Sequence, residues 1–213
     1  DESGSMSDLT RDTIGGFNSM IEKEKKLDVD AHVTTVLFND QYKMLYNRRE
    51  LKDVSKMTDK DYTPGGMTAL LDAVGRTIHK MDMVAGIHRK DKGNKVLFVI
   101  ITDGEENDSK EYTYADVKKL IKDRQENAGW EFIFLGANID AAAAAENLGI
   151  DRDRAVKYKN TGSGVRANFK AVAELSDSLA KSGRVSDRWK ETVEKDEDDA
   201  ADKQSAAVTS HRR

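Results

Sequence analysis

The sequence predicts an α/β domain: a Rossmann-like, doubly wound and mostly parallel sheet with helices on both faces and one antiparallel edge strand. Two apolar runs, residues 96–101 and 132–135, have the continuous hydrophobicity of parallel strands that are covered on both faces. Segments with helical periodicity fill the intervals between the strands. This alternation of strands and helices is typical of a parallel sheet.

Three further strands complete the predicted set. Residues 33–38 are rich in β-branched side chains and end at Asn39-Asp40, which is a turn signal. Residues 43–46 follow so closely that the two segments should form an antiparallel hairpin. Residues 155–158 are a weaker apolar run, and we expect them to form a peripheral strand.

Apolar positions at helical spacing predict five helices. Their apolar faces span residues 9–21, 70–81, 117–121, 141–148 and 167–179, and the last helix should end near Gly183. We therefore expect one domain over residues 1–182. Residues 183–213 are charge-dense or small and polar, so we expect a disordered, solvated tail in which only Trp189 has a reason to dock.

The composition narrows the classes of function. A formal net charge of -4 argues against nucleic acid as the main partner, because phosphate binding needs a basic surface. The chain has no cysteine, which excludes disulfides, zinc–thiolate sites and a cysteine nucleophile, and its 4 histidines are scattered. No apolar run reaches the roughly 18 residues of a transmembrane helix, so a cytoplasmic protein without a membrane span is the default expectation.

The first five residues contain a pattern of oxygen donors. Asp1, Ser3 and Ser5 alternate, so in an extended or turning loop one carboxylate and two hydroxyls face the same side. These are hard oxygen ligands, which suit Mg²⁺ or Mn²⁺ better than zinc. Three oxygens do not complete an octahedron, so further donors must come from elsewhere. Helix capping is the ordinary alternative for Ser5.

Two distant loops supply such donors. Thr68 follows a Gly-rich loop and stands at the start of a predicted helix. Asp103 stands at the end of the most hydrophobic strand, which is an expensive place for a charge unless something pairs with it. An N-cap and an Asp-Gly turn are the ordinary alternatives for these two positions.

The three loops together resemble the metal-ion-dependent adhesion site of von Willebrand factor type A (vWA) domains. The resemblance rests on D-x-S-x-S at Asp1, a Thr in a Gly-rich loop before A-L-L-D-A, and D-G closing an apolar strand. Order and spacing agree with that family over residues 1 to about 182. The stretches VTTVLFND, TALLDA, ITDGEEN and EFIFLGANIDA are similar to stand-alone bacterial members.

The resemblance implies a role for each residue of the site. Ser3 and Ser5 would coordinate Mg²⁺ through their hydroxyls. Asp1 and Asp103 would act mainly through bridging waters, and Thr68 would bind directly only when a ligand is present. Because most direct ligands are neutral, the cation would keep its charge and take an Asp or Glu carboxylate from a partner protein. The implied function is a non-enzymatic, Mg²⁺-dependent protein–protein interaction, with Mn²⁺ as the other candidate cation.

Several neighbouring residues have a candidate place at the rim of this site or behind its ligands. They are Gly4, Gly66, Met67, Asp72, Gly104 and Glu105. The glycines would permit tight turns and keep the rim open. The ordinary alternatives are a gap-filling role for Met67, a helix-dipole position for Asp72, and exposed loop acids for Glu105 and its neighbour Glu106.

Two other functions are compatible with a Mg²⁺ site. A metal-dependent phosphatase or phosphotransferase would use a strand-end Asp as phosphoryl acceptor. The haloacid-dehalogenase pattern, however, needs an acid where this chain has Ser3. A scaffold with a vestigial metal site is the remaining alternative.

The resemblance also implies an upstream strand. In the vWA fold the central strand immediately precedes the D-x-S-x-S loop. No such strand precedes Asp1 in this sequence, so we expect an N-terminally truncated domain whose sheet lacks its first, central strand.

Overall fold

The computed structural model describes residues 1–27, 29–87, 95–186 and 188–196. Within them, β1 (His32–Phe38) and β2 (Tyr42–Glu50) pair antiparallel. The strands β3 (Leu97–Thr102), β4 (Glu131–Gly136) and β5 (Ala155–Lys157) form a parallel sheet in that order. The predicted α/β class, the strands and the hairpin are confirmed, with boundaries that differ by a few residues.

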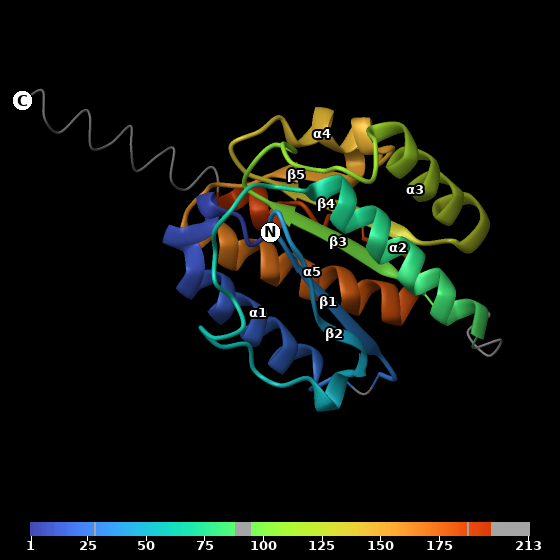
Figure 1. Ribbon diagram of the computed structural model, residues 1–213. Coiled ribbons are helices and arrows are strands. Elements are labelled where there is room, and N and C mark those ends of the chain that lie inside the picture. Colours follow the sequence, from blue (N-terminus) through green and yellow to red (C-terminus); the bar gives the residue numbers. More distant parts are fainter. Residues whose placement is uncertain (28, 88–94, 187, 197–213) are drawn as a thin grey trace, which may run out of the picture.

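Helices cover both faces of the parallel sheet (Figure 1). On one face lie α1 (Thr10–Glu24) and α5 (Gly162–Ser182). On the other lie α2 (Leu70–Ile87), α3 (Tyr114–Ala128) and α4 (Ala141–Leu148). Short 3₁₀ helices are η1 (Gly4–Leu9), η2 (Leu51–Asp53) and η4 (Arg152–Arg154). None of the helices in the described part of the chain is long and apolar enough to cross a membrane.

The side chains of β4 build both cores. Successive residues of a strand point to opposite faces, and β4 is apolar at every one of its central positions. Phe132 and Phe134 belong to the core with α2, α3 and α4, whereas Ile133 and Leu135 belong to the core with α1 and α5. All four side chains are fully buried. The two-sided burial explains the continuous apolar run in the sequence.

Polar caps determine where the helices after the strands begin. Thr113 and Asp116 form a capping box at the start of α3, each side chain accepting a hydrogen bond from the other residue's amide. Asp140 caps α4 and Thr161 caps α5, each through the amide three residues later. These caps fix the loops that leave the carboxyl ends of β3, β4 and β5.

The chain after α5 packs against the domain. Val185, Trp189 and Val193 are 6%, 2% and 1% exposed and belong to the core with α1 and α5. The Trp189 indole donates to the carbonyl oxygen of Asp153 at 3.2 Å, and residues 191–196 are helical. The domain therefore continues past the boundary expected at residue 182, because three apolar side chains four residues apart meet the core. The rest of the expected tail, residues 197–213, lies outside the described residues.

The first two residues join the two sheets at their carboxyl ends. The Asp1 amino group donates to the carbonyl oxygen of Ile101 at 3.1 Å, and the Glu2 amide donates to that of Phe38 at 2.7 Å. Among the described residues β1 and β3 share no ladder, so each keeps one free edge. Most apolar side chains of β3 are only half-buried.

Candidate metal centre

Three loops meet at the carboxyl ends of the strands, where the sequence predicts a metal site. The first loop, residues 1–5, contacts the second loop, residues 63–68, through the backbone. Gly4 N donates to Gly66 O at 3.1 Å, and Gly65 N donates to Glu2 O at 2.9 Å. The third loop, residues 102–113, begins at the last residue of β3 and contacts the second through Asn107. This edge is where ligands bind in doubly wound sheets.

Short hydrogen bonds connect the first loop to the third. Asp1 Oδ1 accepts from the amide of Ser3 at 2.7 Å, and Asp1 Oδ2 accepts from the hydroxyl of Thr102 at 2.6 Å. The Ser5 hydroxyl donates to Asp103 Oδ1 at 2.5 Å, and its oxygen lies 3.0 Å from the Ser3 hydroxyl oxygen. Four of the five predicted ligands therefore form one connected polar cluster.

The fifth predicted ligand, Thr68, faces the same cluster from the second loop. A Cβ atom at Gly104 would lie 3.7 Å from Thr68 Oγ1 and 3.8 Å from Ser5 Oγ, so the two hydroxyls flank one point. Thr68 is 4% exposed, and no hydrogen bond of its hydroxyl is found within the described residues. The absence of a side chain at Gly104 leaves this point open.

The donor set fits a small, hard cation. Two carboxylates and three hydroxyls supply oxygen alone, which Mg²⁺ prefers. In an octahedral Mg²⁺ site, adjacent ligand oxygens are about 2.9 Å apart, and the Ser3 and Ser5 oxygens are separated by 3.0 Å. In the described part of the chain no three His, Cys, Asp or Glu side chains gather as a metal-binding group. A metal at this edge would therefore depend on Ser and Thr hydroxyls.

Asp103 also has partners that the sequence motif does not indicate. Asp103 is 2% exposed, and its Oδ2 accepts from Asn160 Nδ2 at 3.3 Å. Its carbonyl oxygen accepts from Asn138 Nδ2 at 3.5 Å. Asn138 follows β4 and Asn160 follows β5. A search for polar residues directly after each predicted strand would have found both.

Buried groups hold the first loop in place. The Tyr62 hydroxyl donates to Asp1 O at 2.8 Å, and Glu2 Oε1 accepts from the amide of Thr63 at 2.6 Å. Burial raises the pKa of the Tyr62 phenol, so this group stays a neutral donor.

The predicted rim residues border this cluster. Gly66 has a φ of +73°, and a Cβ atom there would lie 1.9 Å from Asp40 Oδ1. This left-handed backbone conformation favours glycine, and a side chain there would also displace the exposed Asp40 side chain. Met67, next to Thr68, is 51% exposed, and Glu105 is also exposed. Both side chains are open to an approaching molecule.

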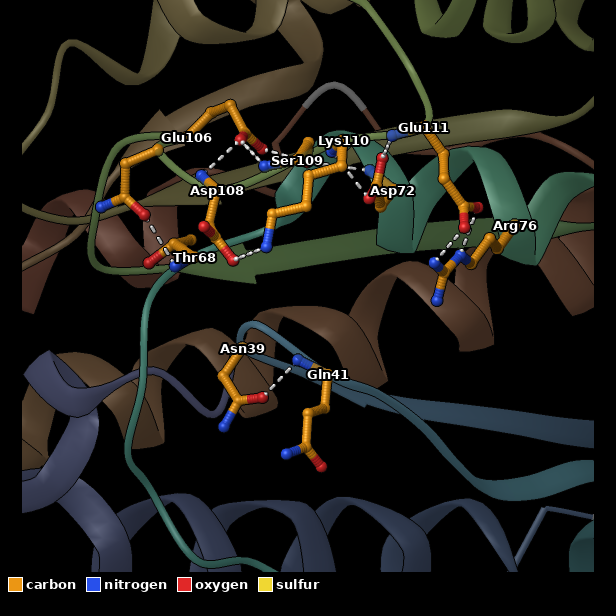
Figure 2. Close-up of polar contacts among 11 residues, drawn as sticks. Asn39, Gln41, Thr68, Asp72, Arg76, Glu106, Asp108, Ser109, Lys110 and Glu111 are labelled. Atoms are coloured by element: carbon orange, nitrogen blue, oxygen red, sulfur yellow. Dashed lines mark hydrogen bonds and ion pairs between the residues drawn. The ribbon is translucent and has the colours of Figure 1, made fainter.

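Asp72 and Glu106 lie behind the second and third loops (Figure 2). The Asp72 carboxylate accepts hydrogen bonds from the amides of residues 110–112, and within the described residues it contacts none of the predicted ligands. Glu106 was expected to be an exposed loop acid, and this is wrong. Glu106 is half-buried and accepts four hydrogen bonds, one of them from the amide of Leu71 at 2.9 Å. Both acids therefore organise the loops.

No protein-family model matches the sequence, and no curated protein matches it either. The structure is similar to a solved protein described as von Willebrand factor type A from Catenulispora acidiphila, with a TM-score of 0.53 and 15% sequence identity. The match covers 82% of this chain and 40% of the other chain, so this chain spans less than half the length of that protein. The fold is a vWA fold.

This similarity concerns the vWA fold alone, because the sequence identity is low. It confirms the fold class expected from the three loops. The bound cation, the role of each ligand and the stand-alone bacterial type stay predictions.

A hollow of about 570 Å³ opens beside the third loop of this vWA fold. Its walls come from the third loop, from the residues that follow β4, and from β5 itself. Exposed polar and charged side chains line it together with buried apolar ones: Glu105, Asn138, Asp140, Lys157, Ile139, Ala141, Ala155 and Val156. The hollow adjoins the candidate centre, because Asn138 also contacts Asp103.

Proposed function

We propose that this vWA domain is a non-enzymatic, Mg²⁺-dependent protein-binding module that takes an Asp or Glu carboxylate from a partner protein. One observation carries the proposal: Asp1, Ser3, Ser5, Thr68 and Asp103 converge from three loops at one edge of the sheet. The vWA fold commonly mediates protein interactions, which agrees with this function.

The chemistry of the donors favours carboxylate capture. Three of the five donors are neutral hydroxyls, so a bound Mg²⁺ would keep enough positive charge to attract one more anion. Both oxygens of each carboxylate accept hydrogen bonds. Asp1 accepts from the Ser3 amide and the Thr102 hydroxyl, and Asp103 accepts from Ser5 and Asn160. These bonds hold the carboxylates in place, whereas a nucleophile would need a free oxygen facing the substrate.

The hollow beside the third loop would take the partner residue next to the captured carboxylate. Glu105, Asp140 and Lys157 give its rim charges of both signs, and the buried Ile139 gives it an apolar wall. We therefore expect a neighbouring partner residue that is polar at its tip and apolar along its stem, since such a side chain satisfies both surfaces.

Metal binding is tested first, without a partner. Mg²⁺ and Mn²⁺ are titrated by calorimetry into the wild-type chain, and urea unfolding is measured with each metal and with EDTA. At ten times its Kd, the metal should raise the free energy of unfolding by about 1.4 kcal/mol if only the folded state binds it. Asp103→Ala should lose this gain, whereas Asp116→Ala, which removes a cap of α3, should keep it. A wild-type chain that neither metal stabilises would indicate a vestigial site.

The partner is tested next. The immobilised wild-type chain should retain a protein from an extract of its source cells in Mg²⁺, and EDTA should release it. Asp103→Ala should not retain this protein. On the purified partner, replacing the contacting Asp or Glu with its amide should weaken binding at least tenfold. An affinity that is equal in Mg²⁺ and in excess EDTA would contradict the proposal.

The enzymatic alternative has its own test. The chain should not hydrolyse p-nitrophenyl phosphate in Mg²⁺. Turnover that disappears in Asp1→Asn would instead favour the phosphatase.

A further inference from the structure

The third loop caps the start of α2 (Figure 2). The Leu71 amide donates to Glu106 Oε2 at 2.9 Å, and the Asp72 amide donates to Ser109 Oγ at 3.0 Å. The first amides of a helix have no partner within the helix, so an outside oxygen must satisfy them. In α2 these oxygens come from residues 35 and 37 positions further along the chain.

A side chain of α2 binds backbone amides of the third loop in return. The Asp72 carboxylate accepts hydrogen bonds from the amides of Lys110, Glu111 and Tyr112 at 3.0, 2.9 and 2.9 Å. Figure 2 shows Asp72 at the start of α2 between Lys110 and Glu111. A carboxylate in the first turn also interacts favourably with the helix dipole. Each segment therefore satisfies backbone groups of the other.

The same contacts reach the candidate ligands. Asn107 Oδ1 accepts from the Thr68 amide at 2.8 Å, and the Asn107 amide donates to Thr68 O at 3.0 Å. The Glu106 carboxylate also accepts from the Asp108 and Ser109 amides at 3.0 and 2.7 Å, which fixes the path of the third loop. These contacts therefore join the second loop, which contains Thr68, to the third loop, which contains Asp103.

We propose that Asp72, Glu106, Asn107 and Ser109 form a clasp of positioning residues that fixes the second loop against the third. The clasp sets the Thr68 hydroxyl relative to the Asp103 carboxylate, although its four residues are not predicted ligands. Because the hydrogen bonds are reciprocal, loosening one end should loosen the other. Its effect on metal binding rests on the proposed function, whereas the coupling between the loops does not need a metal.

Amide hydrogen exchange in EDTA tests this coupling. In Glu106→Ala, exchange should accelerate at least tenfold at Leu71, which Glu106 contacts, and also at Thr68 and Tyr112, which it does not contact. The amides of β4 should keep their protection, which shows that the fold is intact. Asp116→Ala removes a carboxylate cap of the same kind from α3 and should leave Thr68 unchanged. If exchange accelerates at the Leu71 amide but not at the Thr68 amide, the clasp is overturned.

A second variant covers the case in which Glu106→Ala does not fold. Asn107→Ala removes the acceptor of the Thr68 amide but leaves the Glu106 carboxylate in place. Exchange should then accelerate at Thr68 and also at Leu71 and Asp108. If Leu71 and Asp108 keep wild-type rates, the two loops are not coupled and the proposal fails.

Titration with Mg²⁺ separates the clasp from the proposed function. Glu106→Ala should bind Mg²⁺ at least tenfold more weakly than the wild type, and Asp116→Ala should bind it equally well. Glu106→Gln should be intermediate, because its amide oxygen still accepts hydrogen bonds while its amide nitrogen cannot. Equal affinity of Glu106→Ala and the wild type would overturn the positioning role. A wild-type chain that binds no Mg²⁺ contradicts the proposed function, while the exchange rates still decide the clasp.

Discussion

A side chain at Gly66 would need an unfavourable backbone conformation and would displace the exposed side chain of Asp40. The φ of +73° costs an ordinary L-residue about 1–2 kcal/mol, and a Cβ atom would collide with Asp40. Gly66→Ala should therefore lower the free energy of unfolding by about 1–2 kcal/mol, measured by urea unfolding. It should also weaken Mg²⁺ binding, because Gly66 O accepts the hydrogen bond from Gly4.

The neighbouring glycine provides the control for this prediction. A Cβ atom at Gly65 would meet nothing within 4 Å. Gly65→Ala should change the free energy of unfolding by less than about 0.5 kcal/mol. Equal losses in the two variants would show that the conformation of Gly66 is not the cause.

At the scale of residues, local patterns were readable and distant contacts were not. Asp1, Ser3 and Ser5 stand in a motif five residues long, so their spacing alone predicted that they converge. Asn160 reaches Asp103 across 57 positions, and no local pattern announces such a contact. In the sequence Glu106 looks like an ordinary exposed acid of a loop. Only the fold brings its carboxylate to an amide of the first turn of α2.

Two adjacent glycines in α1 differ in what surrounds them. A Cβ atom at Gly16 would lie 2.4 Å from the Phe169 ring of α5, whereas one at Gly15 would meet nothing within 4 Å. Gly16→Ala should lower the free energy of unfolding by about 1–3 kcal/mol, because α1 and α5 would be forced apart. Gly15→Ala should raise it by about 0.5–1 kcal/mol, because alanine favours the helix. Thermal unfolding of the two variants checks both signs, and a stabilised Gly16→Ala would contradict the close packing.

The contact between α2 and the third loop should depend on pH. Burial opposes ionisation of Asp72, but the amides of residues 110–112 and then Arg76 hold the pKa of its carboxyl below its usual range. A lowered folded-state pKa gives stability that is present above the ordinary carboxyl pKa of about 3.9 and is lost as pH falls through the folded-state value. Asp72→Asn should therefore be less stable than the wild type at pH 7, and this difference should shrink in strong acid.

Urea unfolding at several pH values tests this prediction. Asp59→Asn changes an exposed acid and serves as the control, which should follow the wild type throughout. A difference between Asp72→Asn and the wild type that stays constant from pH 7 into strong acid would show that ionisation of Asp72 does not stabilise the contact.

At the scale of elements, the spacing of apolar residues predicted the strands and helices whose apolar side chains are buried. The strands β3 and β4 and the helix α4 were readable because their apolar residues are continuous or regularly spaced. The segment after α5 was not, because Val185, Trp189 and Val193 are dispersed among charged residues. Their burial depends on a core that other elements build.

Trp189 connects the end of the described chain to the whole molecule. It is 2% exposed, and its indole donates a hydrogen bond to the carbonyl oxygen of Asp153, which lies in η4. Trp189→Ala should lower the free energy of unfolding by about 3–5 kcal/mol, as large cavities in a core do. Urea unfolding followed by circular dichroism measures this loss. Arg188→Ala should change stability little, because its ion pair with Glu191 is exposed to solvent. A loss of similar size in both variants would contradict the docking of Trp189.

The divided sheet has a consequence for how molecules of this chain meet one another. The free edge of β3 offers a row of backbone donors and acceptors beside apolar side chains, and such edges template pairing between chains. The hairpin is better guarded, because β2 carries Lys43, Arg48, Arg49 and Glu50. Self-association of this 213-residue chain should therefore begin at β3, and its weight-average molar mass from light scattering should rise with protein concentration before any partner is added.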